Sequence, residues 1–298
     1  MNSSECSSKK VKMIIWGCEM RPFRYLIRTL VLAIYVMIAA APVMAKDVYS
    51  FGVVPQFTAS QTYKIWGPIL NELGDRTGLE FKLKSSSEIP AFEASVLNGE
   101  FDFAYMNPYH FLLAEDLQGY VPLVRDHGRE LYGILVVPEY SDIQDVSELH
   151  GKEIAYPAPN ALGASLLMRT VLEREHGVIA KPKYVSTHTS AYLAAAVHDT
   201  AAGGGVKATL DQQSQILQKS LRILFETPRV PPHPIAAHPR VPAEVHELVK
   251  QTFLDIADSE EGRSLLANVP FVQLGEAISS DYQVLVTFGL EDFYVSPN

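Results

Sequence analysis

The chain has 298 residues, of which 47% are hydrophobic and 20% charged, a composition typical of a soluble globular protein. Its formal net charge is −9, and its two cysteines, Cys6 and Cys18, both lie within the first 45 residues. The acidic charge argues against a nucleic-acid partner, and the lack of cysteine from residue 46 onward excludes disulfides and thiolate metal sites there.

Residues 1–45 have the pattern of a secretory signal peptide. Six basic side chains precede or flank an apolar run that begins at Thr29, and the small-x-small sequence Val43-Met44-Ala45 ends it. The run is short for a membrane span, so we expect cleavage after Ala45 and export to the periplasm, with translation starting at Met1 or Met20. With two acidic residues, this leader carries +4 of the total −9, so the exported chain has a formal charge of −13.

After the leader, short apolar segments alternate with amphipathic ones. The expected strands are 48–54, 81–84, 101–105, 120–124, 131–137, 152–156, 184–187, 221–226 and 233–239. Apolar residues at helical spacing predict helices between them, and only helices are expected after Val241. This alternation predicts an α/β fold with parallel sheets.

Two segments indicate that the chain builds two lobes. One is the long strand GILVVPEYSDI, which begins at Gly133, and the other is the proline-rich sequence TPRVPPHPI, 227–235, where regular structure is prevented. We therefore expect two hinge crossings, a discontinuous first lobe of 46–134 plus 235–298, and a second lobe of 135–234. The cleft between the lobes is the expected ligand site.

Polar side chains gather where expected strands end and helices begin, the edge of an α/β sheet at which ligands bind. In the segment 101–111, Asn107 and Pro108 predict a helix start whose free N–H groups would face an anion. Similar helix starts are expected in YPAPNALGAS, 156–165, and STHTS, 186–190, and such donors suit a tetrahedral oxyanion. The candidate ligand residues are Tyr105, Asn107, Tyr109, His110, Asn160, Gly163, Ser165, His188, Thr189, Ser190 and His233.

The order of these segments resembles the phosphate-, phosphite- and phosphonate-binding periplasmic proteins, the PhnD-like family of type II, transferrin-like clamps. The resemblance covers nearly the whole exported chain and is carried by FGVVPQ, GEFDFAYMNPYHF, LVRDHG…YGILVV, KEIAYPAPNALGAS, STHTSAYLAAAV followed by GGGV, and PPHPIAAHP. It implies a solute-binding protein without catalytic activity or cofactor, a monomer that closes on a small oxyanion. It also implies delivery to an ABC permease or presentation to a membrane sensor protein, with His188 matching the family's histidine.

Three departures from the family's pattern bear on the ligand. Members that bind aminophosphonates carry a Ser-Thr-Ser run where this chain has 161–163, Ala-Leu-Gly, and two carboxylates where it has Ala208 and His233. The family's tyrosine after the third strand corresponds to Met106. A cationic amine would lose its ion pairs here, so the resemblance implies a small anion without an amine.

A secreted enzyme and a metal-binding clamp are the alternative functions. The sequence has no G-x-S-x-G or H-E-x-x-H motif and no cysteine nucleophile after the leader, which disfavours an enzyme. Tyrosine and histidine can bind metals, but the candidate loops offer few carboxylates. Structural roles also stay open for several candidates: core packing for Tyr105 and Tyr109, a helix cap for Asn107, a solvent-facing position for His110 and hinge packing for His233.

Overall fold

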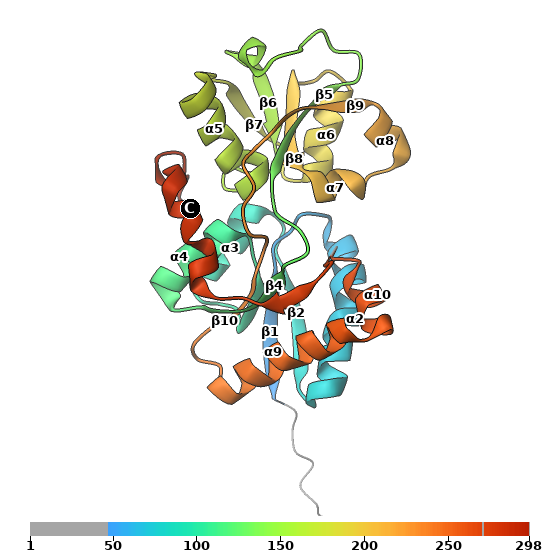
Figure 1. Ribbon diagram of the computed structural model, residues 1–298, viewed down its shortest axis with the longest axis vertical. Coiled ribbons are helices and arrows are strands. Elements are labelled where there is room, and N and C mark those ends of the chain that lie inside the picture. The colour runs from blue at the N-terminus through green and yellow to red at the C-terminus, as the bar shows by residue number, and fades with distance from the viewer. Residues whose placement is uncertain (1–46, 270, 298) are drawn as a thin grey trace, which may run out of the picture. The chain divides into compact units, whose positions relative to one another are not determined.

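Two β-sheets organise residues 47–269 and 271–297, the part of the chain that the computed structural model describes (Figure 1). The predicted signal peptide, 1–45, lies outside the described residues. Within them, the first sheet has the strand order β11-β4-β10-β3-β1-β2 and the second has the order β7-β6-β8-β5-β9. The first sheet with the helices around it is termed lobe 1, and the second sheet with its helices lobe 2.

Lobe 1 is built from both ends of the described chain. Before the first crossing come β1 (Val48–Val53), α2 (Ala59–Thr77), β2 (Glu80–Ser85), α3 (Ile89–Leu97), β3 (Phe103–Tyr105), α4 (Pro108–Gln118) and β4 (Val121–Asp126). After the second come β10 (Ile235–Ala237), α9 (Ala243–Asp258), α10 (Glu260–Leu266), β11 (Leu274–Glu276), and the 3-10 segments η3 (Ser279–Phe288) and η4 (Leu290–Asp292). The expectation that only helices follow Val241 was wrong, because β11 pairs with β4 at the sheet edge.

Lobe 2 is continuous in sequence. It contains β5 (Gly133–Pro138), η1 (Val146–Leu149), β6 (Glu153–Tyr156), η2 (Leu162–Leu166), α5 (Leu167–His176), β7 (Lys181–Tyr184), α6 (His188–Ala196), β8 (Ala202–Val206), α7 (Lys207–Asp211), α8 (Gln215–Lys219) and β9 (Leu221–Glu226). β6 is parallel to β7 and β8, whereas β5 is antiparallel to β8 and β9. In lobe 1, β1 is parallel to β2 and β3, but β10 is antiparallel to β3 and β4. Both sheets are therefore mixed rather than parallel, and each contains a strand that adjoins a crossing and runs against its neighbours.

The lobes are joined by two crossing segments, 127–132 and 227–234, that lie side by side. The N–H of Leu131 donates to the carbonyl oxygen of Val230 at 2.8 Å, and the N–H of Val230 donates back at 2.9 Å. The sequence placed the first crossing at Gly133–Pro138, but all six of these residues are buried as strand β5 of lobe 2. A continuous apolar run of this kind is typical of a strand covered on both faces.

Strand β8 was absent from the strands expected from sequence, because glycine is a poor strand former. A Cβ atom at Gly204 would lie 2.2 Å from the carbonyl oxygen of Ala164, and one at Gly205 would lie 2.0 Å from the hydroxyl oxygen of Tyr192. The missing side chains let η2 and α6 approach the strand directly. The Tyr192 hydroxyl then donates to the carbonyl oxygen of Val206 at 2.9 Å, which fixes α6 against the end of β8.

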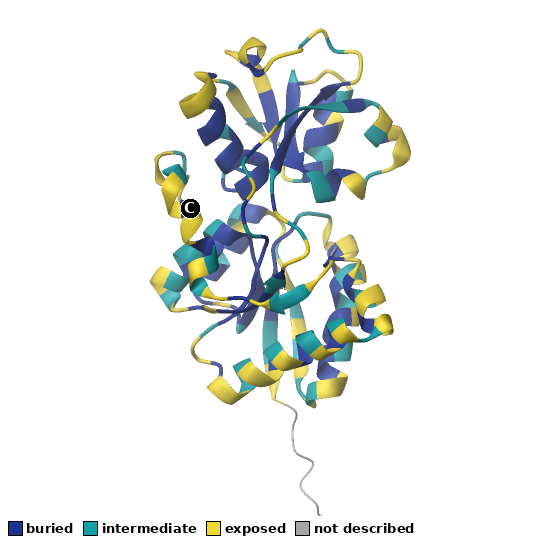
Figure 2. Ribbon diagram, viewed as in Figure 1, coloured by how far each residue is buried: buried dark blue, intermediate teal, exposed yellow. Residues whose placement is uncertain are grey.

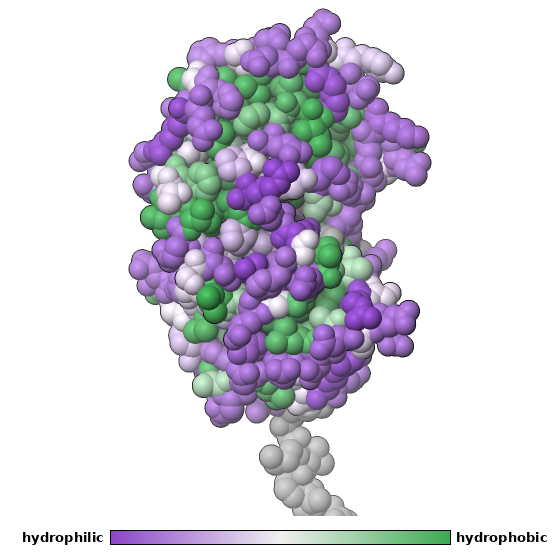
Figure 3. Space-filling model, viewed as in Figure 1, coloured by the Kyte–Doolittle hydropathy of each residue, from purple (hydrophilic) through white to green (hydrophobic). Residues whose placement is uncertain are grey.

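Buried residues follow the strands and the inward faces of the helices in both lobes (Figure 2). On the face shown in Figure 3, hydrophilic side chains dominate and apolar ones appear between them. Across residues 47–269 and 271–297, the structure contains no helix that is both long and apolar enough to cross a membrane.

Candidate ligand-binding cleft

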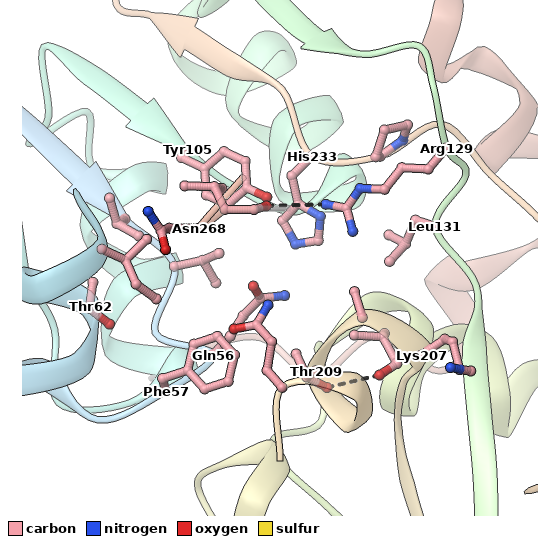
Figure 4. Close-up of a pocket in the computed structure, with 18 of the residues that line it drawn as sticks. Gln56, Phe57, Thr62, Tyr105, Arg129, Leu131, Lys207, Thr209, His233 and Asn268 are labelled. Carbon is pink, nitrogen blue, oxygen red and sulfur yellow. Dashed lines mark hydrogen bonds between the residues drawn. The ribbon is translucent and has the colours of Figure 1, made fainter. Parts of the chain in front are cut away.

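A cleft lies between the lobes, bordered by β1, β3, the crossing segments and the β8–α7 junction (Figure 4). Its larger chamber has about 700 Å³ of space, counting the open mouth, and a smaller chamber has about 300 Å³. The residues that line both chambers are Val54, Gln56, Leu131, Val206 and His233. Because they share these walls, the two chambers adjoin, and together they are termed the cleft.

Five of the candidate ligand residues line this cleft. Tyr105 and His233 line the large chamber, and Asn107, Gly163, His188 and again His233 line the small one. They come from β3, the start of α4, η2, the start of α6 and the second crossing. The six other candidates line neither chamber: Tyr109, His110, Asn160, Ser165, Thr189 and Ser190.

The start of α4 is capped by the side chain of the preceding residue, Asn107. The Asn107 side-chain oxygen accepts from the N–H of Tyr109 at 2.9 Å and from the N–H of His110 at 2.8 Å. Pro108 has no N–H, and the N–H of Phe111 donates to the Asn107 carbonyl oxygen at 3.0 Å. The expectation that this helix offers free N–H groups to an anion was therefore wrong.

The side chain of His110 is fully buried between α4 and α3, and faces neither solvent nor the cleft. Its Nε2 lies 3.5 Å from the carboxylate oxygen Oε2 of Glu93, which is also fully buried. The same Oε2 accepts from Asn160 Nδ2 at 2.9 Å, and Asn160 Oδ1 accepts from the N–H of Val295 at 3.0 Å. Asn160 thus fastens lobe 2 to α3 and to the C-terminal segment.

The three hydroxyl candidates of lobe 2 bond within that lobe. Ser165 accepts from an arginine of α5, and Thr189 donates to the side-chain oxygen of Gln213 at 3.1 Å. The N–H of Ser190 donates to the hydroxyl oxygen of Thr187 at 3.0 Å, which makes Thr187 the cap of α6. Tyr109 is half-buried beside the ring of Tyr294, with ring centroids 5.8 Å apart.

The helix starts of lobe 2 are less completely capped than α4. No side chain caps η2, whose residues Gly163 and Ala164 line the small chamber. In α6 the cap takes the third N–H of the helix, and the first residue, His188, lines the same chamber. First-turn N–H groups have no acceptor inside their own helix, so lobe 2 presents backbone donors at this chamber. Such helix starts favour an anion.

The two cleft histidines are neutral at neutral pH. Burial lowers the pKa of His188 to about 4, and its Nδ1 lies 3.3 Å from the hydroxyl oxygen of Thr209. Burial also lowers the pKa of His233 well below its usual value, assisted by the nearby charge of Arg129. A neutral imidazole has one N–H donor and one acceptor nitrogen, so each ring can donate one hydrogen bond without bringing a charge.

Arg129 is a cleft residue that the sequence patterns did not indicate. Its Nε donates to Asp126 Oδ2 at 3.0 Å, and its Nη2 donates to the Val269 carbonyl oxygen at 3.4 Å. Figure 4 shows the guanidinium pointing toward Tyr105 and His233. Burial raises the pKa of Tyr105 to about 12 although the charge of Arg129 lowers it, so the phenol remains a proton donor at neutral pH. The feature of the sequence that could have indicated Arg129 is its position three residues after Asp126, the aspartate that ends β4.

Further polar residues line the large chamber without having been candidates: Gln56, Thr62, Glu130, Tyr132, Lys207, Thr209, Gln212 and Asn268. Lys207 pairs with Asp211 within α7. Among the described residues, no three His, Cys, Asp or Glu side chains form a group that could hold a metal ion.

A family model described as the phosphonate periplasmic substrate-binding protein of ABC transporters matches residues 51–282. Among solved structures, a binding-protein component of an ABC phosphonate transporter from Pseudomonas aeruginosa has 14% identity and a TM-score of 0.76, over 85% of this chain and 90% of that one. PhnD1 from Prochlorococcus marinus, in complex with methylphosphonate, has 14% identity and a TM-score of 0.75, over 84% and 99%. A Xanthomonas citri protein bound to ATP has 16% identity and a TM-score of 0.68, over 83% and 98%. These structures share the two-lobed α/β fold and confirm the fold class expected from the sequence.

Proposed function

This chain belongs to the family of periplasmic substrate-binding proteins of phosphonate ABC transporters, and from that premise we propose that it captures a small phosphonate-like anion without an amine. Members of this family bind and deliver solutes and are not enzymes. The observation that carries the proposal is the small chamber, where the uncapped start of η2 and the ring of His188 lie together. A tetrahedral oxyanion would accept from both.

Capture would draw on both lobes at once. Tyr105 belongs to lobe 1, Gly163 and His188 belong to lobe 2, and His233 belongs to the crossing between them. Either set alone would hold an anion weakly. When both sets meet the ligand and water is excluded, every charge-assisted bond strengthens, so the ligand favours the closed arrangement.

The remaining features of the proposal concern the protein in the cell. We propose that the mature protein is a monomer, begins at Lys46 after removal of the signal peptide, and bends at the paired crossings 127–132 and 227–234. We favour an ABC permease over a membrane sensor as its partner, because the matching family model is that of a transporter component. The intact mass of the exported protein checks the start, and retention of residues 1–45 would contradict it.

Titration calorimetry tests the proposed ligand class. We expect binding of methylphosphonate, phosphite or phosphate, and weaker binding of 2-aminoethylphosphonate, because Ala208 and His233 offer no carboxylate to an ammonium group. Replacing His188, which lines the small chamber, with alanine should weaken binding of these anions about ten- to a hundredfold, the size expected for one buried bond to an anion. Tightest binding of the aminophosphonate would contradict the proposed class.

A further inference from the structure

The large chamber has an arginine, Arg129, in its wall. Arg129 lines it with a side chain that is only 23% exposed. Glu130, the acidic residue at the same wall, is 63% exposed and lies 3.8 Å from the guanidinium of Arg229. Because exposed charges are screened by water and salt, Glu130 contributes little inside the chamber, and the less exposed charges there are Arg129 and its ion-pair partner Asp126.

Asp126 holds Arg129 in place without using up its donors. The carboxylate of Asp126 is fully buried and accepts from the backbone N–H groups of Gly128 at 2.9 Å, Val272 at 3.0 Å and Gln273 at 2.8 Å. These bonds stabilise the carboxylate charge independently of the arginine. A guanidinium has five N–H donors, and the bonds to Asp126 and to the Val269 carbonyl use only Nε and Nη2.

The groups beside Arg129 are donors as well. The phenol of Tyr105 keeps its proton, and the ring of His233 stacks on it with centroids 5.2 Å apart. His233 lines both chambers, so this donor cluster adjoins the small chamber. A planar carboxylate fits a guanidinium fork with a neighbouring hydroxyl, whereas an ammonium group would be repelled there.

We infer that the ligand has two anionic groups, a phosphonate for the small chamber and a carboxylate that Arg129 recognises in the large one. This inference rests on the proposed function and narrows its ligand to short phosphonocarboxylates. The carbon chain between the two groups would pass the apolar side chains of Val54 and Leu131, which line both chambers. Arg129 is then the residue that determines specificity for the second group.

Calorimetry with methylphosphonate, phosphonoacetate and 3-phosphonopropionate tests the inference on the full exported protein. We expect at least one phosphonocarboxylate to bind about tenfold more tightly than methylphosphonate, the effect of one charge-assisted bond. Arg129→Gln should remove this preference and leave methylphosphonate binding in place. Arg125→Gln is the matched control, because Arg125 lies within β4, the strand that precedes Arg129, but pairs with Asp281 outside the cleft.

A second variant guards against misfolding of the first. Ala208 lines the large chamber, so Ala208→Glu would place a carboxylate there without disturbing the Asp126–Arg129 pair. This variant should also abolish the preference for phosphonocarboxylates over methylphosphonate. Thermal unfolding of each variant checks that it is folded. If methylphosphonate binds and neither phosphonocarboxylate binds more tightly, the inference is overturned and the proposed function stands. If no phosphonate binds at all, the proposed function fails with it.

Discussion

Helices α4 and α6 both begin at the end of a strand segment and both carry a histidine in the first turn, yet the two starts differ in what they offer a ligand. His188 of α6 lines the small chamber. His110 of α4 is fully buried and faces Glu93 of the neighbouring helix α3. Position within the turn accounts for this difference, because His188 is the first residue of its helix and His110 the third.

Capping separates the two helix starts further. Asn107 accepts from two N–H groups, and Pro108 removes a third donor, so α4 has no first-turn donor left for an anion. Thr187 accepts from one N–H, that of Ser190, and leaves the first two positions of α6 to other partners. A helix start whose N–H groups are all capped thus has a structural role, and a partly capped one is a candidate anion site.

The largest expected effect on stability comes from disrupting the buried contact between His110 of α4 and Glu93 of α3. Replacing His110 with alanine removes the ring beside the buried carboxylate of Glu93, and we expect the free energy of unfolding to fall by about 3–5 kcal/mol. Denaturant unfolding at neutral pH measures it. His150→Ala, at an exposed histidine of lobe 2 whose Nδ1 accepts from the N–H of Ile179 at 3.3 Å, is the control and should lower stability by no more than about 1 kcal/mol. A fall of less than about 1 kcal/mol for His110→Ala would show that the His110–Glu93 contact contributes little to stability.

The pH dependence of stability should report on His188. Its pKa is about 4 in the folded protein and about 6.5 in the unfolded chain, so the unfolded chain binds the extra proton between these values. The stabilisation is complete above pH 6.5 and is lost as pH falls toward 4, by up to about 3 kcal/mol. His233, with its lowered pKa, acts in the same direction. The measurement is the free energy of unfolding of wild type and His188→Asn at pH 7 and 4.5. Equal losses of stability in the two proteins would indicate that the His188 ring is solvated in the folded protein.

Much of the fold could be predicted from the sequence, since apolar segments of strand length alternate with helical patterns along most of the chain. Expected and observed strands agree for β9, 221–226, and nearly so for β1. β7 lies at Lys181–Tyr184 rather than 184–187, because it is an exposed edge strand that contains Pro182 and lacks an apolar pattern. β8 was missed because its glycines are required by close packing against η2 and α6, which only the folded structure reveals.

The cleft was predicted less completely than the fold. Tyr105 and His188 could be found because strand ends and helix starts are visible in sequence. Arg129 could not, because its position depends on Asp126, and Asp126 is held by N–H groups about 146 residues away at Val272 and Gln273. Asn107 was found, but the sequence could not show that its side chain would take the donors expected for the ligand.

The smallest expected effects come from the caps themselves. Asn107→Ala and Thr187→Ala should each lower the free energy of unfolding by about 1 kcal/mol, the usual contribution of a helix cap. Asn107→Asp retains an accepting oxygen and should be closer to wild type than Asn107→Ala. Thermal unfolding of the ligand-free proteins measures these changes. Equal destabilisation by alanine and aspartate at position 107 would mean that the bond from Asn107 Nδ2 to the Asn160 carbonyl oxygen matters more than the cap.

The central claim is that a phosphonate binds at the start of α6 and not at the start of α4. The most direct test is the affinity for methylphosphonate, measured by titration calorimetry, of His188→Ala beside His110→Gln. Glutamine at 110 keeps an N–H donor for Glu93, so that variant should fold and bind as wild type does. His188→Ala should bind about ten- to a hundredfold more weakly, because it loses a buried bond to the anion. Weakened binding in His110→Gln together with unchanged binding in His188→Ala would contradict the claim.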